Sequence, residues 1–374
     1  MGDIVEVQTY LQIVLLIMTC IPVLYWIRMK IAPVTVEKRS FSGEIPDVTV
    51  LLPMRNEKKN VNRKLESLMA DIETQENCKL LVVVSGSDDS TETLVEEFLE
   101  KSIIDNSRWS VEAFAEPGKS LAINRAMEKI ETEIVIMTDA DANVSPGWLS
   151  AVIDRLEEES VGVVSGFELE EGTGQDYFNR YYRRNSNWLR LQESIRDSTP
   201  VMEGSLIAWK VRSLGEFSLD ESLNADDSQI GLRAIREGYR SVIDGRISFR
   251  GFGAKRRTIQ ESIRRSQGLS RALLKNTDLA FYSGRRKSRL AILNALSLYV
   301  VFPWTSLLFS LNSIIALAME RDFSANWPLV SILLVLLMLI TPQGRSLVKG
   351  AMISLIAHIQ FLLGNRYNIW NPVR

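Results

Sequence analysis

Polar and charged residues gather next to several short apolar runs of this chain. Seven of them have the chemistry to bind a phosphate or a metal ion: Asn56, Glu57, Asp88, Asp89, Lys119, Asp139 and Asp141. Asp139 and Asp141, two residues apart, can share a hard divalent cation with phosphate oxygens, as Mg²⁺ prefers. Lys119 supplies a positive charge for a phosphate. A single pair of aspartates is as often a loop or helix-cap feature, so the ordered set carries the prediction of a metal-assisted phosphate site.

The elements that must position these residues alternate between strand and helix. Continuous apolar runs lie at 48–52, 80–84, 111–114 and 134–137, and helical spacing lies at 60–69, 92–99 and 119–130. This alternation predicts an α/β fold with a mostly parallel, Rossmann-like sheet covered on both faces, over residues 45–255. Such sheets bind ligands at the carboxyl ends of their strands, where the polar residues stand.

Composition excludes several other kinds of site. The chain has one histidine, His358, in an apolar stretch, so His-ligated metal sites, Ser-His-Asp triads and histidine bases are excluded. Two cysteines, Cys20 and Cys78, rule out a disulfide framework and a cysteine-based zinc site. The net charge of −2 gives no basic footprint for nucleic acid. The chemistry must therefore use carboxylates, Lys or Arg, hydroxyls and backbone groups.

Long uncharged stretches flank the α/β domain. The first, 7–27, is long enough to cross a hydrocarbon core of roughly 30 Å. Asp3 and Glu6 precede it, whereas Arg28 and Lys30 follow it. The positive-inside rule therefore predicts an N-terminus outside the cell membrane and a cytoplasmic α/β domain.

Three further uncharged stretches, 290–319, 323–344 and 350–365, predict about three more transmembrane helices and hence a multi-pass protein. Basic residues beside them agree with the same orientation. A set of buried core helices is the alternative. Segment 256–289 is dense in Lys and Arg, with apolar residues at helical spacing. It is predicted to form basic amphipathic helices on the anionic membrane surface, or simply to flank the spans.

The motifs, taken in order, resemble those of membrane-bound, inverting family 2 glycosyltransferases, the group that includes cellulose synthases and dolichyl-phosphate-sugar synthases. These enzymes have the GT-A fold of nucleotide-diphospho-sugar transferases. The matching motifs are Pro53–Glu57, Val83–Thr91, Gly118–Asn124, Asp139–Asp141 and Asp226–Tyr239. The match runs in the family's order over roughly residues 46–275.

The resemblance implies a role for each motif. The nucleotide-sugar donor would be bound by Pro53, Asn56, Glu57, Ser87, Asp89, Lys119, Asn124 and Asp139. Asp139 and Asp141 would hold Mg²⁺ or Mn²⁺ on the diphosphate. Asp227, beside Asp226, would be the general base, with a pKa raised by the like charge of its neighbour. A helix cap with an acidic first turn is the alternative for this pair.

Two departures from the family pattern bear on the substrates. Ser85 and Gly86 follow the second strand, where many members have an aspartate that reads the base, so the nucleobase stays open. Members that extend polysaccharides carry Q-x-x-R-W, which here begins with Glu261, keeps Arg264 and replaces the tryptophan with Arg265. This change argues against a processive synthase.

The acceptor side is predicted on weaker patterns. Aromatic residues and arginines interleave over 176–196, which suits a lipid-phosphate or sugar-phosphate acceptor at a membrane surface, or else a solvated basic helix face. The predicted acceptor residues are Glu193, Gly204, Arg264 and Arg265.

The sequence as a whole predicts a membrane-bound glycosyltransferase that moves a sugar from a nucleotide-diphosphate sugar to a lipid-linked or glycan acceptor. The closest alternative is a polysaccharide synthase. A nucleotidyltransferase would want a glycine-rich loop after the first strand, and 53–60 has no glycine. A non-enzymatic membrane scaffold would lack the metal or base carboxylates, which are all present.

Overall fold

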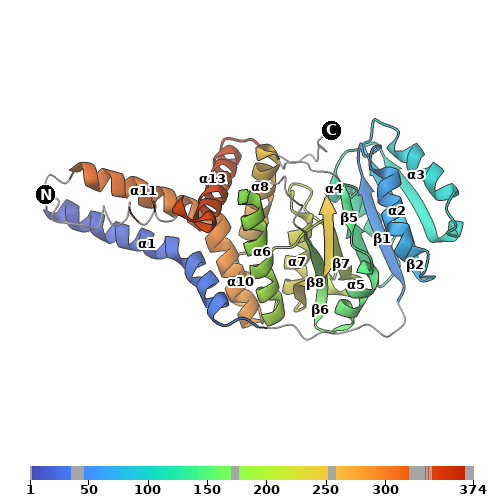
Figure 1. The fold of residues 1–374 in the computed structure, drawn as a ribbon, viewed down its shortest axis with the longest axis horizontal. Helices are drawn as coiled ribbons and strands as arrows, with labels where there is room; N and C mark the ends of the chain where they lie inside the picture. Colours follow the sequence, from blue (N-terminus) through green and yellow to red (C-terminus); the bar gives the residue numbers. More distant parts are fainter. Residues whose placement is uncertain are drawn as a thin grey trace.

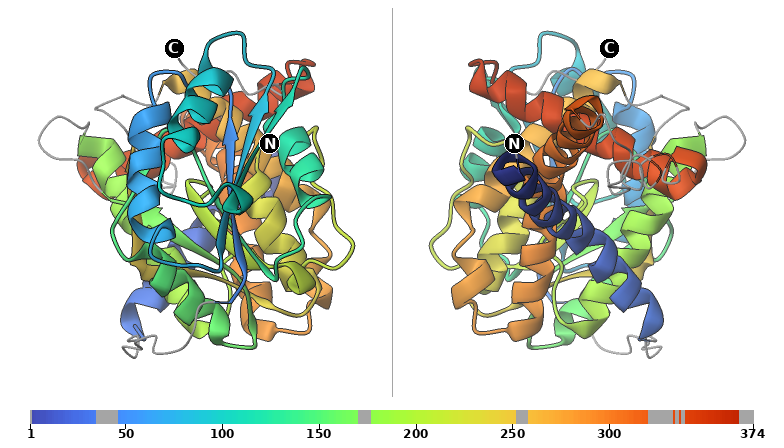
Figure 2. Two further views of the ribbon diagram at one scale, coloured as in Figure 1. Left: turned by 90° about the vertical axis from the view of Figure 1, so that its right-hand side faces the viewer. Right: turned by 90° about the vertical axis from the view of Figure 1, so that its left-hand side faces the viewer.

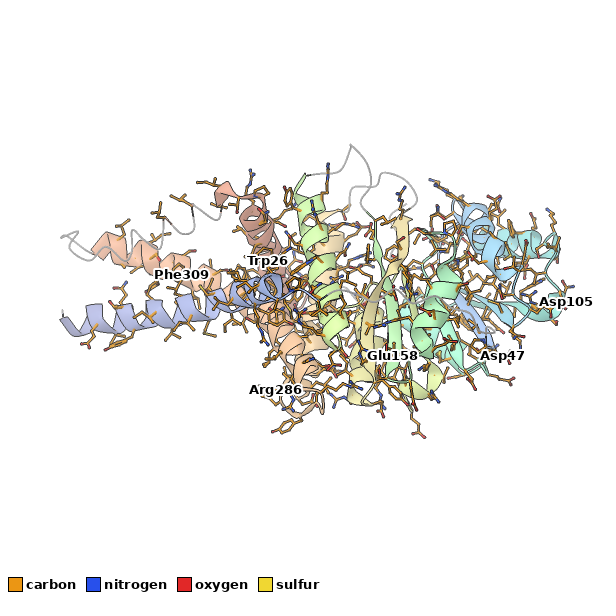
Figure 3. All side chains as sticks on the ribbon, turned by 60° about the horizontal axis from the view of Figure 1, so that its bottom comes forward. Trp26, Asp47, Asp105, Glu158, Arg286 and Phe309 are labelled. Atoms are coloured by element: carbon orange, nitrogen blue, oxygen red, sulfur yellow. The ribbon has the colours of Figure 1, made fainter. Side chains whose placement is uncertain are left out.

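The computed structural model describes residues 2–34, 46–169, 177–251, 258–319, 333, 336 and 339–366. Figure 1 shows an elongated molecule with an α/β domain at one end and a pair of long helices, α1 (Gly2–Ile31) and α11 (Phe302–Met319), at the other. Figure 3 labels Trp26 and Phe309 in the helical part and Asp47 and Asp105 at the far end of the α/β domain.

Eight strands of the described chain form one sheet in the order β3-β2-β1-β4-β7-β6-β8-β5. Their bounds are Val48–Met54 (β1), Cys78–Ser85 (β2), Trp109–Phe114 (β3), Ile134–Thr138 (β4), Ala142–Val144 (β5), Val161–Glu168 (β6), Leu206–Lys210 (β7) and Arg240–Gly251 (β8). The four predicted strands are β1 to β4, and they pair in parallel. The other half is mixed, because β7 runs antiparallel to both β4 and β6, and β5 runs antiparallel to β8.

Helices cover both faces of the sheet, as the unbroken apolar strands require. One core is formed with α2 (Val61–Ile72), α3 (Thr91–Glu100) and α5 (Trp148–Glu157), and contains the fully buried Trp148. The other is formed with α4 (Lys119–Met127) and α7 (Asp226–Arg236), and contains Trp209. Alternate residues of β1 enter the two cores, with Val50 in the first and Leu51 in the second.

A layer of helices lies between this domain and the α1–α11 pair (Figures 1 and 2). It contains α6 (Tyr177–Arg196), α8 (Ile259–Lys275), α9 (Leu279–Tyr282), α10 (Arg286–Leu296) and α13 (Pro342–Leu362). A third core joins it to α7 through side chains such as Leu232, Leu273 and Ile292. The α1–α11 pair is held by a buried hydrogen bond, 2.7 Å long, from Gln12 Nε2 to Ser313 Oγ.

Two helices of the described residues are long and apolar enough to cross a membrane, Glu6–Ile31 and Arg286–Ala318. The second joins α10 and α11 through a π-helical turn, Ser297–Val301. The predicted stretch 350–365 instead lies in α13, which starts earlier, carries Arg345 and Lys349, and packs on α6 and α8. In Figure 1 it lies crosswise to α1, and its Ser354 accepts a 2.9 Å hydrogen bond from Ser266 of α8. Stretch 323–344 lies largely outside the described residues.

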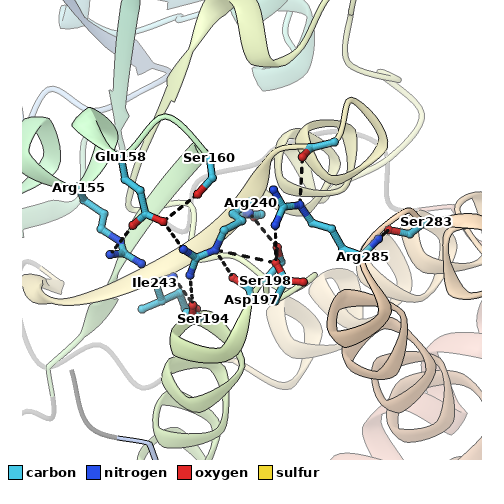
Figure 4. Close-up of polar contacts among 12 residues, drawn as sticks. Arg155, Glu158, Ser160, Ser194, Asp197, Ser198, Arg240, Ile243, Ser283 and Arg285 are labelled. Carbon is cyan, nitrogen blue, oxygen red and sulfur yellow. Dashed lines mark hydrogen bonds and ion pairs between the residues drawn. The ribbon is translucent and has the colours of Figure 1, made fainter. Parts of the chain in front are cut away.

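A network around Arg240 ties the sheet to the helical layer (Figure 4). Its guanidinium pairs with Glu158 and donates to the carbonyl oxygens of Asp197, at 2.9 Å, and Ser194, at 2.7 Å. The Asp197 carboxylate in turn pairs with Arg285, at 3.3 Å, just before α10. Arg240 thus binds acceptor groups near the C-terminal ends of α5 and α6. Through Asp197 it is also linked to Arg285, at the start of the second apolar helix.

We predict that Arg240→Met lowers the free energy of unfolding by about 3 kcal/mol, because it removes a cation from the Glu158 carboxylate and the donor to the carbonyl oxygens of Ser194 and Asp197. Denaturant unfolding measures the loss. Arg212→Met, at an exposed arginine, is the matched control and should change stability by less than about 0.5 kcal/mol. Equal stabilities for the two variants would contradict the assignment.

Candidate active site

One large cavity, about 1940 Å³, opens at the carboxyl ends of β1, β2 and β4. It continues past the first turn of α7 and reaches α1, α6, α13 and the π-helical turn. Its wall includes most of the residues predicted from the sequence: Asn56, Glu57, Asp89, Lys119, Asp139, Asp141, Glu193, Gly204, Asp226, Asp227, Arg264 and Arg265. The sheet edge and the apolar helices therefore share one space.

The loops after β1 and β2 hold each other in place. The Asn56 N–H donates to Ser87 Oγ at 3.0 Å, and the Asp88 N–H donates to Asn56 Oδ1 at 2.9 Å. Asn56 has φ 54°, a left-handed conformation that Asn tolerates better than most residues. The Glu57 N–H donates to Thr91 Oγ1 at 2.8 Å. These bonds present Asn56 and Glu57 toward the cavity as one rigid rim.

Gly86, directly after β2, lies where the chain approaches another loop closely. Gly86 has φ +59°, and a Cβ on it would lie 2.8 Å from Pro117. The neighbouring Ser85 Oγ accepts from the Gly118 N–H at 2.9 Å. The close approach of the two loops therefore requires glycine at position 86.

Three residues predicted to bind the donor do not line the cavity. Pro53 is buried within β1, and Ser87 serves as the acceptor for the Asn56 amide. Asn124 instead holds the segment before α7, because its side chain accepts from the Leu219 N–H at 2.7 Å and donates to the Leu219 carbonyl at 3.0 Å. Ser87 and Asn124 thus hold loops of the site.

Asp139 and Asp141 stand in the turn between β4 and β5. Lys119 Nζ lies 2.8 Å from Asp139 Oδ1, and Ser205 Oγ donates to Asp139 Oδ2 at 3.2 Å. Burial opposes the charge of Asp139, but Lys119 outweighs it and lowers the pKa of that carboxyl. Asp141 is exposed to the cavity mouth.

The carboxylate pair fits a divalent cation of the magnesium or manganese type. No group of three or more His, Cys, Asp or Glu side chains that could hold a metal occurs among the described residues. Two carboxylates with the remaining positions left for diphosphate and water are the usual protein contribution to such a cation. Asp139 and Asp141 would hold it, and it would neutralise charge on the diphosphate.

Lys64, on α2, lies directly beneath this pair, and the sequence analysis missed it. Its side chain is fully buried, and Nζ donates to Thr138 Oγ1 at 2.7 Å and to the Ala142 carbonyl at 2.6 Å. These two partners flank Asp139 and Asp141 in the chain. Burial lowers the pKa of Lys64 to about 7, against the attraction of both aspartates. The feature of the sequence that could have identified Lys64 was a lysine among the apolar positions of the predicted helix 60–69.

Asp226 and Asp227 open α7 on the other side of Lys119. Lys119 Nζ lies 2.8 Å from Asp226 Oδ2, so one ammonium group joins Asp226 to Asp139. Desolvation and the carboxylates of Asp226 and Glu203 raise the pKa of Asp227 to about 7, although Lys119 opposes them. A Cβ at Gly204 would lie 3.4 Å from Asp227 Oδ2, so glycine leaves the space beside this carboxyl open.

The predicted acceptor residues come from three elements. Glu193 of α6 is buried, accepts from Thr199 Oγ1 at 2.7 Å, and has a pKa raised to about 7 by burial. Arg264 and Arg265 of α8 face the cavity near the aspartates of the β4–β5 turn. Glu261, which replaces the family's glutamine, forms a capping box with Thr258 at the start of α8. Glu261 therefore stabilises the start of α8.

We predict that Lys64→Met weakens binding of Mn²⁺ at least tenfold, because the turn carrying both aspartates loses the group that ties its ends. Electron paramagnetic resonance of Mn²⁺ with nucleoside diphosphate present measures the affinity. The control is Lys210→Met, a second buried lysine that donates to a backbone carbonyl, that of Glu158 at 2.9 Å, away from the cavity.

Lys210→Met should leave the affinity for Mn²⁺ unchanged. If Lys64→Met unfolds, Thr138→Val removes one of the two contacts and provides the milder test. Unchanged Mn²⁺ affinity in a folded Lys64→Met protein would overturn the positioning role.

Known proteins resemble this chain in sequence. Residues 49–216 match the model of glycosyl transferase family 2. Glycosyltransferase AglE of Haloferax volcanii is 25% identical over 201 residues, which are 53% of this chain and 64% of AglE. Probable glycosyltransferase YdaM of Bacillus subtilis is 27% identical over 126 residues, which are 33% of this chain and 30% of YdaM. The chain thus spans less than two thirds of the length of these relatives.

A solved structure shares the fold over almost the whole chain. The mannosyltransferase PcManGT of Pyrobaculum calidifontis, in complex with GDP-Man and Mn²⁺, superposes with a TM-score of 0.77 at 23% identity. The superposition covers 95% of this chain and 99% of PcManGT. Residues 49–216 therefore match glycosyl transferase family 2, and the superposition shows that the chain has the GT-A fold.

Proposed function

We propose that this chain is a glycosyltransferase and a multi-pass protein of the cell membrane, and that it transfers a sugar, with inversion, from a nucleotide-diphosphate sugar to a lipid-linked acceptor. The observation that carries the proposal is the single cavity that joins the carboxyl ends of the strands to the apolar helices. A water-soluble donor can enter at the sheet edge, and a lipid can enter between α1, α13 and the π-helical turn. The two reactants then meet at Asp227.

The donor half is built for a nucleotide diphosphate. Asn56, Glu57 and Asp89 line the rim where a nucleoside would lie. Lys119, Arg264 and Arg265 supply positive charge beside the metal carboxylates, which suits a diphosphate leaving group. Mg²⁺ or Mn²⁺ on Asp139 and Asp141 would stabilise that leaving group; PcManGT was solved with Mn²⁺.

Asp227 is the proposed general base for a single, inverting displacement. It lies at the opening of α7, beside Gly204, and faces the same cavity as the donor rim. Asp227 takes the proton of the acceptor nucleophile as the new bond to the sugar C1 forms. The bond from C1 to the diphosphate breaks at the opposite face, which inverts the anomeric centre.

The membrane placement rests on the two apolar helices, Glu6–Ile31 and Arg286–Ala318. Many of their large apolar side chains are exposed, for example Leu24, Leu308 and Ile314. Such a surface is stable in lipid rather than in water. With Arg28 and Lys30 at the inner end of α1, the catalytic domain faces the cytoplasm and the N-terminus lies outside.

A polysaccharide synthase is the second candidate that the sequence left open. Glu261 is committed to the helix cap, and Arg265 stands where such synthases carry a sugar-stacking tryptophan. These two features favour a single transfer.

Asp227→Asn should lower the rate of transfer at least 100-fold, because the amide accepts no proton, while donor affinity changes less than about threefold. Release of nucleoside diphosphate from UDP-, GDP- and dTDP-sugars, with Mn²⁺ or Mg²⁺ and total membrane lipid, measures the rate. Asp278→Asn, at a surface aspartate paired with Arg236, is the control and should keep full activity. A folded Asp227→Asn protein with normal turnover would disprove the base assignment.

The rate should depend on pH through the same carboxyl. Since the pKa of Asp227 is about 7, the base is mostly protonated below pH 7, and the rate should fall about tenfold per pH unit there. Above pH 7 the rate should reach a plateau. The measurement is kcat between pH 5.5 and 8.5 at saturating donor, and a rate independent of pH down to 5.5 would contradict it.

A further inference from the structure

The middle of the cavity, between Asp227 and the apolar helices, has a polar wall made of residues that have no proposed role in donor binding. This wall, which we call the middle wall, consists of Tyr182, Arg190, Glu203, Asn294 and Tyr299. Tyr182 and Tyr299 lie against each other, and both act on Arg190. The middle wall therefore joins α6, the strand connection before β7, and the second apolar helix around one space.

Two cations in this part of the cavity are paired with carboxylates. Arg190 is bound to Glu203, and Lys119 is shared between Asp139 and Asp226. Arg265 acts on both aspartates of the β4–β5 turn, and Arg264 acts on Asp226 and Asp139. A phosphate placed beside Asp227 would thus meet the carboxylates of Asp226 and Glu203, whose neighbouring cations already interact with carboxylates.

Asn294 offers the second observation. Its side chain is 5% exposed and lines the cavity, and its Oδ1 has no hydrogen-bond partner among the described residues. A buried amide oxygen without a donor is rare and unfavourable, and a ligand hydroxyl would satisfy it. Asn294 lies one turn before the π-helical segment Ser297–Val301, and such segments occur frequently at functional sites.

The presence of a proposed general base also favours a sugar hydroxyl over a phosphate as the nucleophile. A phosphate oxygen is ionised at neutral pH and needs no base, whereas a sugar hydroxyl must lose a proton as it attacks. The carboxylates of Asp226 and Glu203 also raise the pKa of Asp227, and a phosphate there would be repelled by all three groups.

We propose that the middle wall binds a sugar unit of the acceptor, so that the nucleophile is a sugar hydroxyl of a lipid-linked glycan rather than a lipid phosphate. This inference rests on the proposed function and specifies its acceptor. In the reaction the hydroxyl oxygen bonds to C1 of the donor sugar, and its proton passes to Asp227. The C1–O bond to the diphosphate breaks, the nucleoside diphosphate leaves, and the product is an O-glycoside.

Two amphiphilic acceptors separate the possibilities. The full chain, solubilised in a detergent without sugar, is given radiolabelled UDP-, GDP- and dTDP-sugars with Mn²⁺. The acceptors are decyl glycosides of mannose, glucose and N-acetylglucosamine, or farnesyl phosphate. We expect transfer to at least one glycoside to be at least tenfold faster than to farnesyl phosphate, with a product that survives mild acid. Faster transfer to farnesyl phosphate, giving an acid-labile glycosyl phosphate, would overturn the proposal.

If neither probe reacts, the acid stability of the radiolabelled product formed with total membrane lipid shows which kind of acceptor is used. An acid-stable product supports the sugar acceptor, and an acid-labile one contradicts it. Failure to consume any donor in every arm, lipid extract included, would instead count against the proposed function itself.

Substitutions then test whether the sugar of the acceptor binds at the middle wall. Asn294→Leu should raise KM for the decyl glycoside at least fivefold and leave KM for the donor unchanged. Ser288→Ala is the control, because it removes another unpartnered, buried polar group of α10 that does not line the cavity. If Asn294→Leu fails to fold, Tyr182→Phe takes its place with the same expectation. Unchanged KM for the glycoside in the folded variant would overturn the location.

Discussion

One ammonium group, that of Lys119, holds the two halves of the active site together. It lies 2.8 Å from both Asp139 and Asp226, which come from the end of β4 and the start of α7. Burial opposes the charge of Lys119, and the two carboxylates raise its pKa above the ordinary value. Because a buried cation needs its partners, Asp139 and Asp226 are kept at a fixed separation. In the proposed reaction, this ion pair would set the distance between the leaving group and the base.

The rest of the fold serves to bring these three residues to one point. Parallel pairing of β1, β2 and β4 collects the loops after each strand at one edge. The antiparallel β7 then brings Gly204 and Ser205 beside Asp139 and Asp227. The N-terminal end of α7 favours the negative charge of its first two aspartates. The mixed half of the sheet is thus what joins the acceptor side to the donor side.

Sequence patterns predicted the parts of this arrangement that are local. The four apolar runs gave β1 to β4 with bounds changed by only a few residues, because a buried strand has an unbroken apolar signature. The motifs identified the cavity wall but could not tell a side chain that faces a ligand from one that holds a loop, as at Ser87 and Asn124. Lys64 and Asn294 were not found, because their importance comes from burial and from partners distant in the chain.

The packing of the helices depends on contacts between residues that are far apart in the sequence, so local sequence patterns did not predict it. Stretch 350–365 is apolar enough to resemble a span, yet α13 packs across α6 and α8, where Ser354 Oγ accepts a 2.9 Å hydrogen bond from Ser266 Oγ. The same limit applies to the mixed half of the sheet, whose antiparallel strands are set by long-range pairing rather than by local periodicity.

In the proposed reaction, the contact between α1 and α6 would bring a soluble donor and a lipid-linked acceptor to one carboxylate. The backbone of Val34, just after α1, exchanges two hydrogen bonds with the side chain of Gln192, at 2.9 and 3.1 Å. Lys30 Nζ lies 3.7 Å from the centre of the Trp188 ring, a cation–π contact. The hydroxyl of Tyr25 also reaches Glu193. These contacts fix the apolar helix relative to the helix that carries the middle wall. An acceptor whose lipid lies along α1 would therefore present its polar group at a constant depth, and the depth of the proposed base Asp227 would select which atom reacts.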